Sequence, residues 1–266
     1  MRRMKRRVAA FGSGAAIGTL GGLIGLGGAE FRLPVLMGGF RYNALEAVIL
    51  NKAMSLVVVA TALPFRAQIV PFSALVEHWT IIVNLLLGSI FGAWFGAGWA
   101  TRLKTATLCR VIAALLIAVA LILLFDHGSH GGGAALFDGP GLWISGIIAG
   151  LGVGVFASLL GVAGGELLIP IIVILYGLDM KLAGSQSLAI SLPTMLTAFT
   201  RYSRDKSFVV ISRNYSFIAV MAIGSVLGAS LGGQLLGIVS SQVLLPALAA
   251  ILFISAIKVW THPCSP

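Results

Sequence analysis

The sequence predicts an all-α polytopic membrane protein with two homologous, inverted repeats, each containing a glycine-broken, re-entrant helix and three transmembrane helices. Composition is the first observation behind this: 58% of the 266 residues are hydrophobic and 10% are charged, whereas about 25% of residues in ordinary soluble domains are charged. The second is a series of long apolar runs, each a candidate transmembrane helix. The third is a pair of motifs that occur twice at one offset, which indicates an internal duplication.

The duplication rests on positions that lie 136 residues apart. The first motif is Gly18, Leu23, Gly25, Gly28, Glu30 and Pro34, and it recurs as Gly154, Leu159, Gly161, Gly164, Glu166 and Pro170. The second motif is Gly88, Ser89, Gly92, Ala93 and Gly96, and it recurs as Gly224, Ser225, Gly228, Ala229 and Gly232. We therefore expect a first transmembrane repeat at 1–125 and a second at 141–266. The polar, glycine-rich stretch 126–140 predicts a linker loop between them.

The apolar segments fall at 8–40, 43–64, 72–99, 106–125, 141–177, 181–200, 214–237 and 242–260. Two of them are too long for one helix, because at about 1.5 Å per residue they measure about 50 and 55 Å, against a hydrocarbon core of about 30 Å. Glycine weakens a helix and proline removes a backbone donor. We expect breaks near Gly27-Gly28 and Gly164-Gly165, with each segment leaving the membrane on the side where it entered.

The net charge of +10 comes from basic residues that mostly flank the apolar spans. This is the cytoplasmic-loop bias of membrane proteins and not the basic face of a nucleic-acid-binding protein. With both broken segments re-entrant and the N-terminus inside, 14 Lys and Arg lie inside and two outside; with all eight segments crossing, the numbers are 11 and five. The charges favour the inverted arrangement, with both termini cytoplasmic and the loop 126–140 periplasmic.

The two breaks are the first candidate site. Broken helices are tolerated in a membrane only where they are buried in protein or line a cavity, and free N–H groups at half-helix N-termini suit an anion. The alternative is that these glycines only allow close helix packing.

Glu30 and Glu166 are the only carboxylates matched in both repeats. A carboxylate inside a membrane is costly and indicates function. Either glutamate could carry a proton; the alternative is a structural pair, such as Glu30 with Arg32 or Lys52.

Arg32 and Lys52 have no charged counterparts, since Leu168 and Leu188 stand at the matching positions. Positive charge in one half suits an anionic substrate, although Lys52 could instead extend to the membrane surface. Nearby polar residues predict either a polar pocket or interhelical hydrogen bonds: Asn51, Ser55, Gln186, Ser187 and Ser191.

The remaining motifs indicate structure. The Gly88 and Gly224 motifs predict close helix packing. His127 and His130 lack further ligands nearby, so we expect no metal and no cofactor. No nucleotide-binding or hydrolase motif occurs, which predicts that the protein is not an enzyme.

Three stretches carry a resemblance: GGLIGLGGAEFRLP at 21–34, GVAGGELLIP at 161–170 and AGSQSLA at 183–189. They resemble the sulfite exporter TauE/SafE family of membrane permeases. The resemblance covers nearly the whole chain and implies transport of small, mostly sulfur-containing anions across the bacterial plasma membrane. Ala29 and Ala163 stand where a fuller glycine triplet is expected.

We therefore expect a secondary transporter of a small anion in the inner membrane, with protons as a candidate coupling ion and a homodimer as a candidate assembly. A channel-like anion pore and a non-transporting scaffold or assembly factor are the alternatives. The expected substrate-binding residues are Gly27, Gly28, Glu30, Arg32, Asn51, Lys52, Gly164, Gly165, Glu166, Gln186 and Ser187.

Overall fold

The computed structural model describes residues 2–24, 28–67, 72–125, 139–178 and 180–235, with seven further positions between 250 and 259. Every regular element in these residues is helical, as the sequence predicts. Within the described residues, four helical stretches are long and apolar enough to cross a membrane: Ala44–Ala62, Trp79–Ala100, Pro140–Leu160 and Tyr215–Gly232. The protein is therefore a polytopic membrane protein.

The helices before the linker are α1 (Arg2–Ile24), α2 (Ala29–Pro34), the π-helical turn η1 (Val35–Gly39), α3 (Ala44–Ala67), α4 (Phe72–Glu77), α5 (Trp79–Ala100) and α6 (Thr105–Phe125). Those after it are α7 (Pro140–Leu160), α8 (Gly165–Tyr176), α9 (Met180–Tyr202), the 3₁₀ turn η2 (Lys206–Phe208), α10 (Val209–Arg213) and α11 (Tyr215–Leu235). Both long apolar segments break where their glycines predict. The linker residues 126–138 lie outside the described part of the chain.

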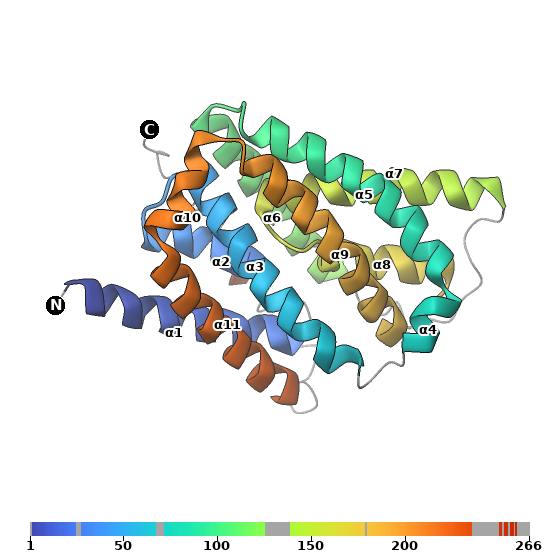
Figure 1. Ribbon diagram of the computed structural model, residues 1–266, viewed down its shortest axis with the longest axis horizontal. Helices are drawn as coiled ribbons and strands as arrows, with labels where there is room; N and C mark the ends of the chain where they lie inside the picture. Colours follow the sequence, from blue (N-terminus) through green and yellow to red (C-terminus); the bar gives the residue numbers. More distant parts are fainter. Residues whose placement is uncertain are drawn as a thin grey trace.

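Two parallel helix pairs flank the bundle (Figure 1). α1 packs along α11, α5 packs along α7, and α3 and α9 contact each other between these pairs. Helices α5 and α7 run in the same direction, because Leu85 and Ser89 meet Gly150 and Gly154 in that order. Each pair thus joins a helix from before the linker to one from after it.

Glycines allow both pairs to approach closely. A Cβ at Gly88 of α5 would collide with the carbonyl of Ile147 on α7, and a Cβ at Gly224 of α11 would meet the carbonyl of Phe11 on α1. Both the glycines and their partners lie 136 positions apart. The glycine motifs are helix-packing faces, as the sequence predicts.

The second glycine-broken segment folds into a hairpin. Gly164, just before α8, lies against Val153 and Ala157 of α7. At the other end of α8, the Tyr176 hydroxyl lies against Gly146, near the start of α7. Helix α8 therefore runs back along α7 toward the end of the bundle where α7 begins.

The first broken segment also doubles back. Gly28 lies against Ile17 and Gly21 of α1. After α2 and η1, the hydroxyl of Tyr42 accepts a hydrogen bond of 2.8 Å from Arg6, in the first turns of α1. Both segments thus double back within the bundle. Helix α7, with 21 residues, is about 31 Å long and is itself long and apolar enough to cross a membrane, so re-entry from one side of the membrane stays a prediction.

One end of the bundle collects the basic residues, and we call it the basic end. Arg6 lies there near Tyr42, and Arg201 and Arg204 lie over the ring of Trp94. Helices α5 and α9 end there, since Gly98 lies against Arg201. Figure 1 shows α7 starting at the end of the bundle away from the N-terminus.

Candidate anion site at the helix breaks

Left-handed glycines form both breaks. Gly161 (φ 69°) caps the C-terminus of α7, and Gly164 (φ 87°) precedes α8. Gly28 (φ 69°) precedes α2 in the first break. L-residues with a side chain rarely adopt this conformation, which explains why glycine is needed at these positions. Gly27 lies outside the described residues, and Gly165 is the first residue of α8.

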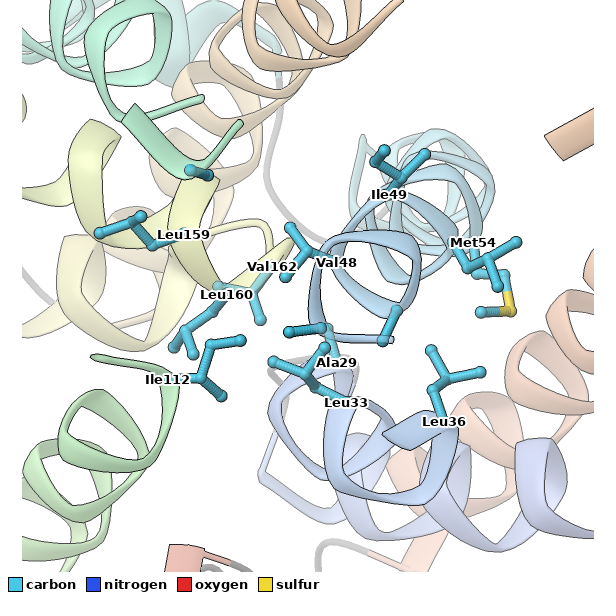
Figure 2. Close-up of a cluster of buried hydrophobic side chains, with 14 of the residues drawn as sticks. Ala29, Leu33, Leu36, Val48, Ile49, Met54, Ile112, Leu159, Leu160 and Val162 are labelled. Carbon is cyan, nitrogen blue, oxygen red and sulfur yellow. The ribbon is translucent and has the colours of Figure 1, made fainter. Parts of the chain in front are cut away.

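Apolar packing brings the two breaks together (Figure 2). Ala29 and Leu33 of α2 lie near Val48 of α3, with Leu160 and Val162 of the second break beside them. All five side chains are buried. The hydrophobic core therefore positions the polar groups that follow.

Asn51 of α3 connects the two breaks directly. Its Nδ2 donates to the carbonyl of Ala29, at the start of α2, over 2.9 Å, and to the carbonyl of Leu160, at the end of α7, over 3.0 Å. Its Oδ1 accepts from Nη1 of Arg32 over 3.2 Å. One fully buried carboxamide thus contacts both breaks and a guanidinium.

Lys52, the next residue of α3, is also fully buried. Its ammonium donates to the carbonyls of Ala157 (2.8 Å) and Val162 (2.7 Å) at the second break. Carbonyls at a helix C-terminus lack partners within the helix and carry its negative dipole end, so a cation is favourable there. In this conformation Lys52 completes the break on the other side of the linker and does not extend to the surface.

Arg32 projects from α2 and is 0% exposed. Besides Asn51, Nη1 donates to Ser55 over 3.2 Å and Nη2 donates to Ser225 over 3.3 Å. Its Nε has no hydrogen-bond partner among the described residues. Glu30 is 1% exposed, and its charge acts on this guanidinium; a structural Glu30–Arg32 pair stays a prediction.

Glu166 cannot be placed in the same way. Its backbone lies in the first turn of α8, but its side chain lies outside the described residues. Its role stays a prediction.

The polar residues of α9 differ in their partners. Ser187 donates to the carbonyl of Gly184 over 2.8 Å, a bond within its own helix. Gln186 is fully buried, and neither its Oε1 nor its Nε2 has a partner in the described part of the chain. The Ser191 hydroxyl is likewise buried without one. Because native proteins normally satisfy such groups, these atoms are candidates for contact with a bound polar solute.

Sequence reasoning missed Ser225 as a contact of Arg32. The signal was present, because Ser225 and its counterpart Ser89 both occur inside the packing motifs. Ser89 lies 2.7 Å from Thr194 of α9. Each serine thus lies on a closely packed helix face and also forms a hydrogen bond with a side chain of another helix: Ser225 with Arg32 of α2, and Ser89 with Thr194 of α9.

The described side chains give the breaks a positive balance, with Arg32 and Lys52 against Glu30. Buried ions cost several kcal/mol each unless they are compensated, and here carbonyls, amide and hydroxyl groups supply part of the compensation. No cluster of three potential metal-ligating side chains occurs among the described residues. The two cations, and the donors of Arg32, Gln186 and Ser191 that have no partner in the described part of the chain, are chemically suited to an anion.

The helices define the class of a polytopic membrane protein. The family model described as "Sulfite exporter TauE/SafE" matches residues 10–259. The chain therefore belongs to the TauE/SafE family, whose members are membrane transporters of sulfite or related anions and not enzymes. No curated protein and no solved structure matches the chain.

Proposed function

We propose that this protein is a secondary transporter that moves sulfite or an organosulfonate across the membrane by alternating access. Membership of the TauE/SafE family supports the transporter class. The observation that carries the location of the site is the carboxamide of Asn51, which contacts both breaks and Arg32. Substrate sites at the midplane, where two broken helices of related repeats meet, are a recurring arrangement in secondary transporters.

The anion accepts hydrogen bonds from groups that lack them in this conformation: Nε of Arg32, Nε2 of Gln186 and the hydroxyl of Ser191. Backbone N–H groups at the start of α8 add donors and a positive dipole end. A sulfite or sulfonate group has three oxygens that can accept from several directions at once. The two cations at the breaks, Arg32 and Lys52, favour an anion over a neutral solute.

Alternating access requires the broken hairpins to move relative to α3. The bonds of Lys52 to Ala157 and Val162, and of Asn51 to Leu160, tie α3 to the second hairpin. In the proposed cycle these bonds break and reform, so they are present in one of the two access conformations and absent from the other. Proton binding by Glu30 or Glu166 is the proposed coupling step, since burial disfavours the charged form of a carboxyl group.

The basic end faces the cytoplasm in this proposal, because Lys and Arg accumulate in cytoplasmic loops. The N-terminal arginines lie at that end, whereas α7 begins at the other end. The loop 126–140 is then periplasmic, the halves are inverted, and the membrane is the inner membrane.

The test uses the full-length protein, first in detergent and then in liposomes. Thermal stabilisation by sulfite, ethanesulfonate, thiosulfate and acetate measures binding, and counterflow of the stabilising anion measures transport. We expect Gln186→Leu to reduce the affinity, about ten-fold if one hydrogen bond of about 1.4 kcal/mol is lost. Leucine is the residue at the matching position 50 of the first repeat, and Gln186 makes no side-chain bond to the described protein, so the fold should survive.

Arg32→Met is the second variant, with Arg110→Met on the exposed face of α6 as its control. Only Arg32→Met should abolish binding and counterflow. Unchanged affinity in both Gln186→Leu and Arg32→Met would show that the anion does not bind at the helix breaks. Voltage-driven currents far above carrier turnover would identify a channel instead.

A further inference from the structure

A cavity of about 370 Å³ opens at the basic end, between the first turns of α1 and the start of α11. Arg6, Arg7 and Arg213 line it together with polar and aromatic residues that begin α11. We propose that this pocket binds a phosphate monoester or diester group, supplied either by an anionic phospholipid or by a soluble phosphate compound. It lies apart from the helix breaks and has no part in the proposed transport site.

The charge of the pocket is unbalanced. Its lining contains three arginines and no acidic residue. Arg6 is held in place, because its Nη2 donates to the Tyr42 hydroxyl over 2.8 Å and its guanidinium lies 5.5 Å from the ring centroid of Phe217. Arg7 and Arg213 are exposed and available to a ligand. Guanidinium groups bind phosphate oxygens through paired N–H donors.

The start of α11 adds donors to the same cavity. The Asn214 carbonyl accepts from the N–H of Ile218 over 2.9 Å, which makes it the first acceptor of the helix. The N–H groups of Tyr215, Ser216 and Phe217 therefore have no acceptor within the helix. The side chain of Asn214 is bound to Tyr42 and to a carbonyl of α10. Free N–H groups and the positive dipole end favour an anion here.

The fold itself does not require these arginines. The corner that matches at the 136-residue offset lies between α5 and α7, and it has the same helix pairing. There, Leu142 and Trp143 replace Arg6 and Arg7, and Glu77 replaces Arg213. The basic cluster is thus absent from the matching corner and is not required by the helix pairing.

A lipid source is consistent with the surroundings of the pocket. Tyr215 is 74% exposed, and Val8 is 67% exposed on the neighbouring face of α1. Tyrosine is enriched at membrane interfaces, and basic pockets between helices on the cytoplasmic side bind anionic head groups. The apolar residues would contact the acyl chains while the arginines hold the phosphate.

Binding is tested on the purified full-length protein in a neutral detergent, by thermal shift and native mass spectrometry. The probes are dioctanoyl phosphatidic acid, dioctanoyl phosphatidylcholine, glycerol 3-phosphate and inorganic phosphate. We expect the phosphatidic acid to bind more tightly than the phosphatidylcholine, whose choline group would face the arginines. Binding of the lipid alone assigns a lipid site, and comparable binding of glycerol 3-phosphate assigns a soluble ligand. Failure of all three anionic phosphates to bind overturns the proposal.

The double variant Arg7→Gln/Arg213→Gln should weaken the affinity about ten-fold or more, as expected for the loss of charge-assisted contacts. Arg102→Gln/Arg110→Gln removes the same charge from exposed positions outside the pocket and should leave the affinity unchanged. Equal losses in both double variants would mean nonspecific charge attraction and would overturn the site.

Ser216→Asp separates binding from folding. Aspartate in the first turn of α11 is favourable for the helix dipole, so the melting temperature should hold or rise. The same carboxylate lies in the pocket lining and should repel a phosphate. Unchanged phosphate affinity in this variant would contradict the pocket.

Discussion

The ammonium of Lys52 donates to the carbonyl of Val162 over 2.7 Å, so a lysine from before the linker completes the helix break that follows the linker. The same ammonium bonds to Ala157, in the last turn of α7. A basic residue that the sequence suggests for substrate contact is thus engaged by the backbone of the opposite half in this conformation. Its two roles can be separated by experiment.

Lys52→Met should lower the stability of the protein. The substitution removes the ammonium that bonds to both carbonyls. The carbonyl of Ala157 still accepts from the backbone N–H of Val162 over 3.0 Å, whereas the carbonyl of Val162 loses the donor that Lys52 supplies, at a cost of about 1–3 kcal/mol. The melting temperature in detergent should fall, whereas Lys104→Met, at an exposed position before α6, should leave it unchanged. A normal melting temperature together with a ten-fold loss of sulfite affinity would instead make Lys52 a substrate ligand.

Gly154 and Gly152 lie on the same helix and offer a matched pair. A Cβ at Gly154 would collide with the carbonyl of Ser89 on α5, whereas at Gly152 nothing lies within 4 Å. Gly154→Ala should therefore force α5 and α7 apart and lower the melting temperature. Gly152→Ala should be neutral or stabilising, since alanine favours a helix over glycine by about 1 kcal/mol. Equal melting temperatures for the two variants would show that the close approach is not required.

The sequence predicts much of this fold because its strongest signals are local. Apolar length, glycine clusters and the 136-residue offset predict the two breaks, and the breaks occur at Gly28 and Gly161–Gly164. The sequence also distinguishes Arg32 and Lys52, because they are charged residues within apolar segments and have no charged counterparts 136 residues later. It could not predict their partners, since Lys52 bonds to carbonyls 105 and 110 positions away and Arg32 to a serine 193 positions away.

The hydrogen-bond partners of the polar residues on α9 depend on how that helix packs against its neighbours. Ser187 and Gln186 are neighbours in sequence, yet one bonds within its own helix and the other has no partner among the described residues. Residue type alone makes both of them candidates for a polar pocket. Only the orientation of α9 against its neighbours distinguishes them.

The topology gives a third prediction. If three spans precede the loop 126–140, that loop is periplasmic; if four precede it, the loop is cytoplasmic. In a background with Cys109 and Cys264 replaced, Ser129→Cys should react with an impermeant thiol reagent in intact cells. Ser203→Cys, at an exposed position of the basic end, should react only after lysis. The reverse pattern, with Ser129→Cys protected until lysis, would reject the inverted arrangement.

The coupling ion gives the last prediction, which concerns the two matched glutamates. Glu30 is buried, and its charge acts on the guanidinium of Arg32 two positions along the chain; a nearby opposite charge stabilises a carboxylate in general. The position that matches Arg32 in the second repeat is Leu168, which is also buried. No arginine on α8 therefore holds Glu166 in its charged form, so we expect Glu166 to be the proton carrier.

Glu166→Gln resembles the protonated carboxyl group but cannot release a proton. Transport driven by a pH gradient across liposomes should stop in this variant, while exchange of the anion between the two sides continues, since exchange needs no net proton movement. Glu30→Gln is the matched control; it leaves Arg32 without its nearby carboxylate and should mainly lower the melting temperature. Full gradient-driven transport by Glu166→Gln would exclude Glu166 as the carrier. Loss of both transport modes together with poor stability would assign it a structural role at the start of α8.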